Sequence, residues 1–108
     1  MRQWLVNPKF LCVKHLNGEH LEGHMFLGCI KKGTSLKGYI EKGSVEIQKI
    51  QERHDELALE MLSRVYKHSS PLNSENLLWT EGNVDIIENI EELKRRCPEC
   101  RRRIENGG

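Results

Sequence analysis

The chain has 108 residues, 37% hydrophobic and 31% charged, with a formal net charge of +1. This length suits one small domain, and no stretch approaches the roughly 20 apolar residues of a membrane span. Because the start also lacks the basic-then-apolar layout of a signal peptide, we expect a cytoplasmic protein without a membrane partner. Basic residues gather toward both ends, which permits a positive face without a high isoelectric point.

The first helix is expected to begin at Asn7 and Pro8 and to run to about Lys31. Asparagine is a good N-cap, and proline at the first helical position loses nothing by lacking an N–H donor. The apolar run before it, residues 4–6, should lie against the core and hold the start of the chain in place. Gly18 and Gly23 each lower the stability of a helix by about 1 kcal/mol relative to alanine. A helix that keeps such glycines often does so because another helix or a ligand packs closely there.

One face of this helix carries His15, Glu19 and Glu22, because spacings of three and four return to the same side of a helix. An imidazole and two carboxylates facing the same way could perform acid–base chemistry, or they could be a solvated surface. The local pattern leaves both interpretations open.

The rest of the chain predicts two further helices joined by loops. Residues 31–43 hold three glycines and several lysines and are expected to form a loop, either phosphate-contacting or simply solvated. An amphipathic helix should follow with Ser44 as its cap, then a turn-rich linker over 67–82 that Trp79 fastens to the core. A third helix is predicted from about Asn83 to Arg96. The expected fold class is therefore all-α, a compact domain of about three helices over residues 1–96, with 97–108 as a separate basic tail.

The tail contains Cys97-Pro98-Glu99-Cys100, which has the C-x-x-C spacing of half a structural zinc site. The sequence offers no second C-x-x-C, so a fourfold site would need Cys12 and Cys29, or histidines, brought in by the fold. The alternative is a pair of reduced, unliganded thiols. A disulfide scaffold is not expected without a signal sequence.

Three spaced motifs occur in order along the chain. Residues 15–22 read HL-x-x-E-x-x-E and are followed by Phe26 and Gly28. Residues 56–66 read EL-x-x-E-x-x-x-R-x-aromatic, with Val65 where a glycine would be expected, and residues 68–71 read H-x-SP. Over residues 1 to about 72 the chain thus resembles the pyrimidine-dimer DNA glycosylase family, the phage-type endonuclease V proteins.

The resemblance implies a compact helical fold in which the start of the chain passes close to the first two long helices. It also implies a monomeric DNA glycosylase with abasic-site lyase activity on double-stranded DNA, with a pyrimidine dimer as the expected lesion. In this family the terminal α-amine attacks the sugar and forms a Schiff base, so no cofactor is needed for catalysis. An α-amine, with an ordinary pKa of about 7.7–8.0, is partly neutral at physiological pH, whereas lysine at about 10.4 is not.

The resemblance assigns roles to individual residues. Met1 would be the nucleophile, since the bulk of Arg2 should prevent removal of the initiator methionine. Glu22 would stabilise the cationic sugar and move protons, His15 would be a further catalytic residue, and Glu19 is left without a role. The residues expected to contact DNA are Arg2, Lys14, Arg53, His54 and Arg64.

The chain also departs from the phage members of the family. Leu21 and Met25 stand where those enzymes carry DNA-contacting arginines, and the basic CPEC tail replaces an aromatic, lysine-rich C-terminus. The competing hypothesis is a non-catalytic, small helical nucleic-acid-binding module, zinc-stabilised or not, whose basic tail supplies the affinity.

Overall fold

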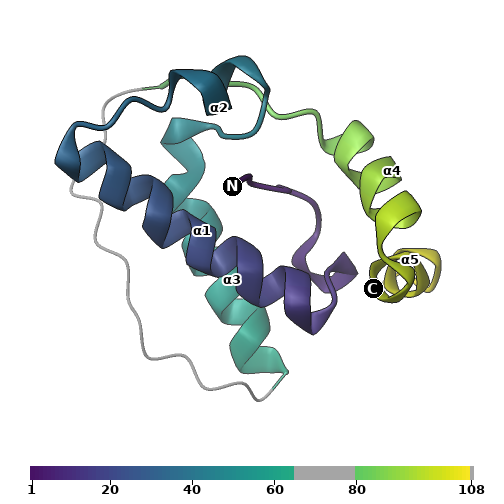
Figure 1. Ribbon diagram of the computed structural model, residues 1–108. Helices are drawn as coiled ribbons and strands as arrows, with labels where there is room; N and C mark the ends of the chain where they lie inside the picture. Colours follow the sequence, from purple (N-terminus) through teal and green to yellow (C-terminus); the bar gives the residue numbers. More distant parts are fainter. Residues whose placement is uncertain (65–79, 108) are drawn as a thin grey trace.

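The computed structural model describes residues 1–64 and 80–107. Within this part the regular secondary structure is entirely helical, which confirms the predicted all-α class, but the estimate of about three helices is wrong because five α-helices are present (Figure 1). They are α1 (Val13–Lys32), α2 (Lys37–Glu41), α3 (Ile50–Ser63), α4 (Ile86–Arg96) and α5 (Pro98–Glu105), together with 3-10 turns at Pro8–Phe10 and Ile47–Lys49.

The first predicted helix is divided in two. Asn7 does act as a cap, since its side-chain oxygen accepts a hydrogen bond from the Lys9 amide at 3.0 Å, but it caps only the 3-10 turn Pro8–Phe10. Leu11 and Cys12 are then extended, and α1 begins at Val13. The break turns both of these side chains into the core, where Leu11 and Cys12 are buried.

The extra helices, α2 and α5, lie in segments predicted to be a loop and a tail. Helix α5 begins at Pro98, and the preceding residue caps it, because Cys97 Sγ accepts a hydrogen bond from the Cys100 amide at 3.5 Å. In contrast, α3 does not start at Ser44. The Ser44 carbonyl accepts a hydrogen bond from the Gln3 amide, so the residues after Ser44 lie alongside the start of the chain before the helix begins at Ile50.

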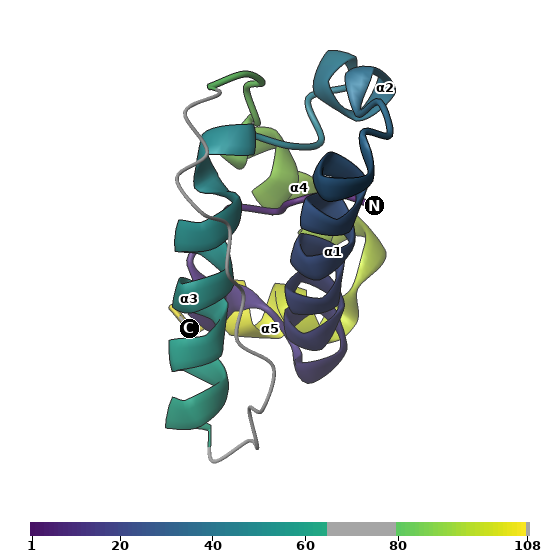
Figure 2. The same cartoon turned by 90° about the vertical axis from the view of Figure 1, so that its left-hand side faces the viewer.

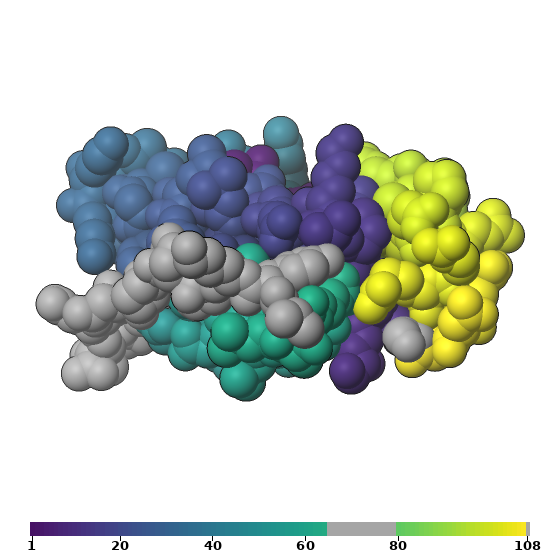
Figure 3. Space-filling model, turned by 90° about the horizontal axis from the view of Figure 1, so that it is seen from below, coloured from purple at the N-terminus to yellow at the C-terminus, as the bar shows by residue number. Residues whose placement is uncertain are grey.

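The core consists of two clusters of buried side chains. The first joins the N-terminal segment, the start of α1, the end of α3, and both C-terminal helices; Figure 3 shows α4 and α5, in yellow-green and yellow, against the purple N-terminal residues. Cys100 is fully buried in it, so α5 is part of the packed domain. The second cluster lies between the end of α1, the α2 region and the start of α3, and the Met1 side chain packs against it.

The first six residues run through the middle of the molecule as an extended segment, interrupted at Leu5, where the backbone is left-handed with φ 55°. Helices α1 and α3 lie on one side of it and α4 on the other (Figures 1 and 2). Helices α1 and α3 also pack directly against each other. The start of the chain is thus enclosed by elements from the rest of the sequence.

The glycines of α1 do not have the helix-packing role expected from the sequence, and other residues singled out there are not described by the structure. An ideal Cβ placed on Gly18 or Gly23 meets nothing within 4 Å in the described part, so these glycines are not required by close packing of another helix there. Tyr66, His68 and Trp79 lie outside the described residues. None of the described helices has the length and apolar character needed to cross a membrane.

Candidate active site

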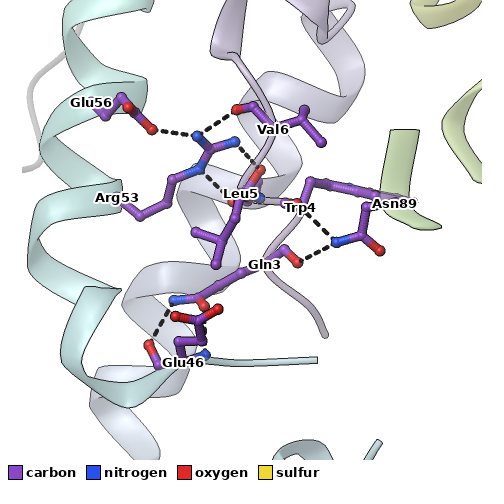
Figure 4. A network of polar contacts seen from close by, with 9 residues as sticks. Gln3, Trp4, Leu5, Val6, Glu46, Arg53, Glu56 and Asn89 are labelled. Carbon is purple, nitrogen blue, oxygen red and sulfur yellow. Dashed lines mark hydrogen bonds and ion pairs between the residues drawn. The ribbon is translucent and has the colours of Figure 1, made fainter. Parts of the chain in front are cut away.

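The candidate active site is built around the extended N-terminal segment, and its first anchor is Gln3. The Gln3 amide donates to the Ser44 carbonyl at 2.7 Å, and the Gln3 side-chain oxygen accepts from the Glu46 amide, also at 2.7 Å. The Gln3 side-chain nitrogen donates back to the Glu46 carbonyl at 3.4 Å (Figure 4). Backbone and side chain together fix this residue to the segment that precedes α3.

The second anchor is Asn89, which reaches the segment from α4. Its Nδ2 donates to the Trp4 carbonyl at 2.8 Å and to the Gln3 carbonyl at 3.4 Å. Its Oδ1 accepts from Arg2 Nη2 at 2.6 Å. A single buried amide therefore satisfies two backbone carbonyls and one guanidinium, and it ties α4 to the start of the chain.

The third anchor is a buried ion pair between Arg53 of α3 and Glu19 of α1, which are only 4% and 2% exposed. The pairing is bidentate, with Nε–Oε2 at 2.7 Å and Nη2–Oε1 at 2.9 Å. Arg53 Nη1 also donates to the Val6 carbonyl at 2.7 Å and to Glu56, while Leu5 N donates to Glu19 Oε2 at 3.5 Å. Burial alone would lower the pKa of Arg53, but Glu19 and Glu56 raise it, so the guanidinium stays charged.

These anchors place the chain terminus beside Glu22. The Met1 α-amine lies 3.7 Å from Glu22 Oε1, with the Met1 side chain 12% exposed and that of Glu22 27% exposed. Burial raises the pKa of Glu22 above its ordinary value, against the opposing effects of the α-amine and Arg2. The pair is thus partly desolvated yet still reachable from solvent.

Arg2 lies next to this pair and stacks on an indole ring. Its guanidinium carbon is 3.8 Å from the Trp4 ring centroid, within cation–π distance, and that of Arg96 from α4 is 5.7 Å from the same centroid. Burial, followed by the charge of Arg96, lowers the pKa of Arg2. The structure therefore gathers positive charge on the side of Met1 that faces α4.

His15 does not lie with Met1 and Glu22. It precedes Glu22 by seven positions, which is about 10 Å along the helix axis. Its Nδ1 is instead 3.2 Å from Cys12 Sγ and 3.5 Å from Cys100 Sγ. A catalytic role for His15 stays a prediction, and its contacts connect it to the cysteines.

The predicted DNA-contacting residues fall into two groups. Arg53 and His54 are buried, His54 with its ring 4.5 Å from that of His20 and 4.9 Å from that of His24, centroid to centroid. Lys14 is exposed. Arg64 is half-buried, and its guanidinium donates hydrogen bonds to the Glu60 carboxylate and to the Pro8 carbonyl. Direct DNA contact stays a prediction for all of them, and burial makes Arg53 and His54 anchors of the protein interior.

The sequence alone does not mark Gln3, Glu46 or Asn89 as part of the site. Each is a polar residue whose burial depends on a partner 38 to 87 positions away, so no local spacing marks it. The weak signals were a glutamine beside an apolar run and an asparagine on the apolar side of an amphipathic helix. Glu19, which had no assigned role, becomes the partner of Arg53.

Comparison with known proteins adds one finding. The model of a protein family described as pyrimidine dimer DNA glycosylase matches residues 1–74. Searches of curated proteins and of solved structures each give no significant match. The matched region contains Met1, Glu22 and the Arg53–Glu19 pair, whereas α4 and α5, with Asn89, lie beyond it.

Replacing Arg53 with methionine should lower the free energy of unfolding by about 3–5 kcal/mol, because Glu19 would remain buried without its cation. The exposed pair of Arg101 and Glu105 provides the matched control, and Arg101→Met should cost no more than about 0.5 kcal/mol. Urea denaturation of both variants measures the difference. A loss below about 1 kcal/mol for Arg53→Met would contradict the role given to this pair.

Proposed function

This chain belongs to the pyrimidine dimer DNA glycosylase family, and from that premise we propose that it excises a damaged base and then cleaves the DNA strand at the resulting abasic site. The family establishes the enzyme class, a DNA glycosylase acting on DNA. The lyase step, its Schiff-base chemistry and a pyrimidine dimer as the lesion are parts of the proposal.

The observation that carries the proposal is the 3.7 Å separation of the Met1 α-amine and Glu22 Oε1. The neutral amine attacks the sugar carbon C1′ and forms a C–N bond, and the damaged base leaves with the electrons of the glycosidic bond and takes up a proton. Opening of the sugar ring gives a Schiff base. Loss of a C2′ proton then expels the 3′ phosphate by β-elimination, and water releases the amine.

Glu22 suits the proton transfers in this sequence. Its carboxylate can accept a proton from the attacking amine, return that proton to the ring oxygen O4′ as the sugar opens, and then accept the C2′ proton, and its negative charge favours the cationic sugar. Burial raises its pKa, which brings it closer to the pH at which a general acid–base works well. The Schiff base needs a primary amine at this position, and the anchored N-terminal segment supplies one.

The surface around the pair supports contact with an opened duplex. Leu21 and Met25 flank Glu22 on α1 and are 59% and 47% exposed. A glycosylase must move its target nucleotide out of the base stack, and apolar side chains can fill the space between the remaining bases. In the proposal Leu21 and Met25 touch bases, while exposed Lys14 on the same helix contacts phosphate.

Borohydride reduction in the presence of abasic-site DNA should give a covalent protein–DNA adduct, because reduction converts a Schiff base into a stable amine. Selective acetylation of the Met1 α-amine should abolish the adduct, as measured by denaturing gel electrophoresis. Lys37→Arg, which changes an 80% exposed amine on α2, should leave the yield unchanged. No adduct with the unmodified protein, despite DNA binding, would favour the non-catalytic nucleic-acid-binding alternative.

Glu22→Gln should reduce strand cleavage at an abasic site by about 100-fold or more, since it removes a proton-transfer group without changing size. Binding of the same DNA should be retained. Glu41→Gln on α2, where the carboxylate is 64% exposed, is the matched control and should retain full activity. Equal cleavage by Glu22→Gln would remove this residue from the mechanism.

The pH dependence of strand cleavage should follow the raised pKa of Glu22. The active form of Glu22 is the carboxylate, so the ratio of wild-type to Glu22→Gln activity should fall as the pH decreases through a value above 4.5, the ordinary glutamate value. Single-turnover rates measured across the acidic range test this expectation. A ratio that falls only at or below 4.5, or one that does not change with pH, would contradict it.

A further inference from the structure

Three cysteines and a histidine meet where the two ends of the described chain pack together. Cys12 and His15 come from the start of α1, and Cys97 and Cys100 from the junction of α4 and α5. We call these four residues the cysteine–histidine cluster. One ligand atom from each, three sulfurs and one imidazole nitrogen, lies within 4.8 Å of all the others.

The distances within the cluster are those of a tetrahedral metal site. Zinc–sulfur and zinc–nitrogen bonds of about 2.3 and 2.0 Å place tetrahedral ligands about 3.8 Å apart for two sulfurs and about 3.5 Å apart for sulfur and nitrogen. Cys12 Sγ and Cys97 Sγ are 3.8 Å apart. His15 Nδ1 is 3.2 Å from Cys12 Sγ and 3.5 Å from Cys100 Sγ.

The backbone around the cluster is arranged to support thiolates. The Cys12 amide donates to Cys100 Sγ at 3.3 Å, and the Cys100 amide donates to Cys97 Sγ at 3.5 Å. These N–H groups point at atoms that carry negative charge when a metal is bound. The charges of Arg96 and Lys14 act on His15, and they complement the net −1 charge of one zinc ion with three thiolates.

Neither a disulfide nor a site with Cys29 fits these contacts. All four cysteines are free thiols, and the Cys12–Cys97 sulfur separation far exceeds the roughly 2.05 Å of an S–S bond. Cys29 packs against the second core cluster, away from the other three. His15, three residues after Cys12 in the same turn of chain, takes the place that the sequence left open for Cys29 or a histidine.

We propose that the cysteine–histidine cluster binds one Zn²⁺, with Cys12, Cys97 and Cys100 as thiolate ligands and His15 Nδ1 as the fourth. Four protein ligands close the coordination sphere, so the site is structural. It fastens the α4–α5 pair to the start of α1, and through α4 it supports Asn89. This proposal does not depend on the glycosylase chemistry.

Metal analysis of the full-length protein, purified without chelators or a metal-binding tag, should find about one zinc per chain. Cys97→Ser and Cys100→Ser should lose most of it, whereas Cys29→Ser, the matched thiol outside the cluster, should keep it. Wild-type protein without zinc above background would overturn the proposal. Full zinc content in Cys97→Ser, or loss of zinc in Cys29→Ser, would overturn the assignment equally.

X-ray absorption spectroscopy on the wild-type protein identifies the zinc ligands even if the serine variants do not fold. The zinc edge should show three sulfurs at about 2.3 Å and one nitrogen at about 2.0 Å. His15→Cys should retain zinc and change the shell to four sulfurs. A shell of oxygen and nitrogen ligands, or a shell unchanged by His15→Cys, would contradict the proposed ligand set.

Discussion

The polypeptide starts with an extended segment in the middle of a helical protein, and in the described part of the structure no strand lies beside it to pair with its backbone. The Gln3 amide does bond to the Ser44 backbone carbonyl. Buried N–H and C=O groups without partners cost about 1–3 kcal/mol each, so side chains must supply the remaining hydrogen bonds. Arg53 does so for Val6, Asn89 for Gln3 and Trp4, and Glu19 for Leu5. The Arg53–Glu19 pair is central because it joins α3, α1 and this segment at one buried point.

The position of the Met1 amine follows from these hydrogen bonds. The first and last residues of most protein chains are poorly ordered because few contacts hold them, and an amine without a fixed position would be a poor catalytic group. Here the Met1 side chain packs into the second core cluster while Gln3, two residues later, is fixed at both its backbone and its side chain. The amine is therefore held beside Glu22 by the packing and the hydrogen bonds of the residues that follow it.

The start of the chain is held both by the region that the family model matches and by the rest of the chain. Helices α1 and α3, which supply Glu19, Glu22 and Arg53, fall inside the matched residues 1–74. Helix α4 falls outside them but supplies Asn89, and the cysteine–histidine cluster joins α4 and α5 to the start of α1. The C-terminal part of this protein thus serves the start of the chain structurally, a role that its basic composition did not suggest.

The sequence predicted the all-α class, and the family resemblance placed the Met1 amine beside the first long helix, as the structure does; catalytic roles for Met1 and Glu22 stay predictions. It did not predict how the stripe of His15, Glu19 and Glu22 would be used. Residues on one helix face lie along a line, and seven positions span about 10 Å, so each of the three meets a different partner. His15 meets the cysteines, Glu19 meets Arg53, and Glu22 meets the Met1 amine. Gln3 and Asn89 could not be found this way, because their burial is decided by long-range packing.

In the proposed mechanism, the anchored N-terminal segment presents the Met1 amine as the reacting group. The most direct measurement is peptide mapping by tandem mass spectrometry of the protein after reductive coupling to abasic-site DNA. We expect the sugar remnant to be attached to the α-nitrogen of Met1. Attachment to a lysine side chain, with the Met1 amine unmodified, would contradict it.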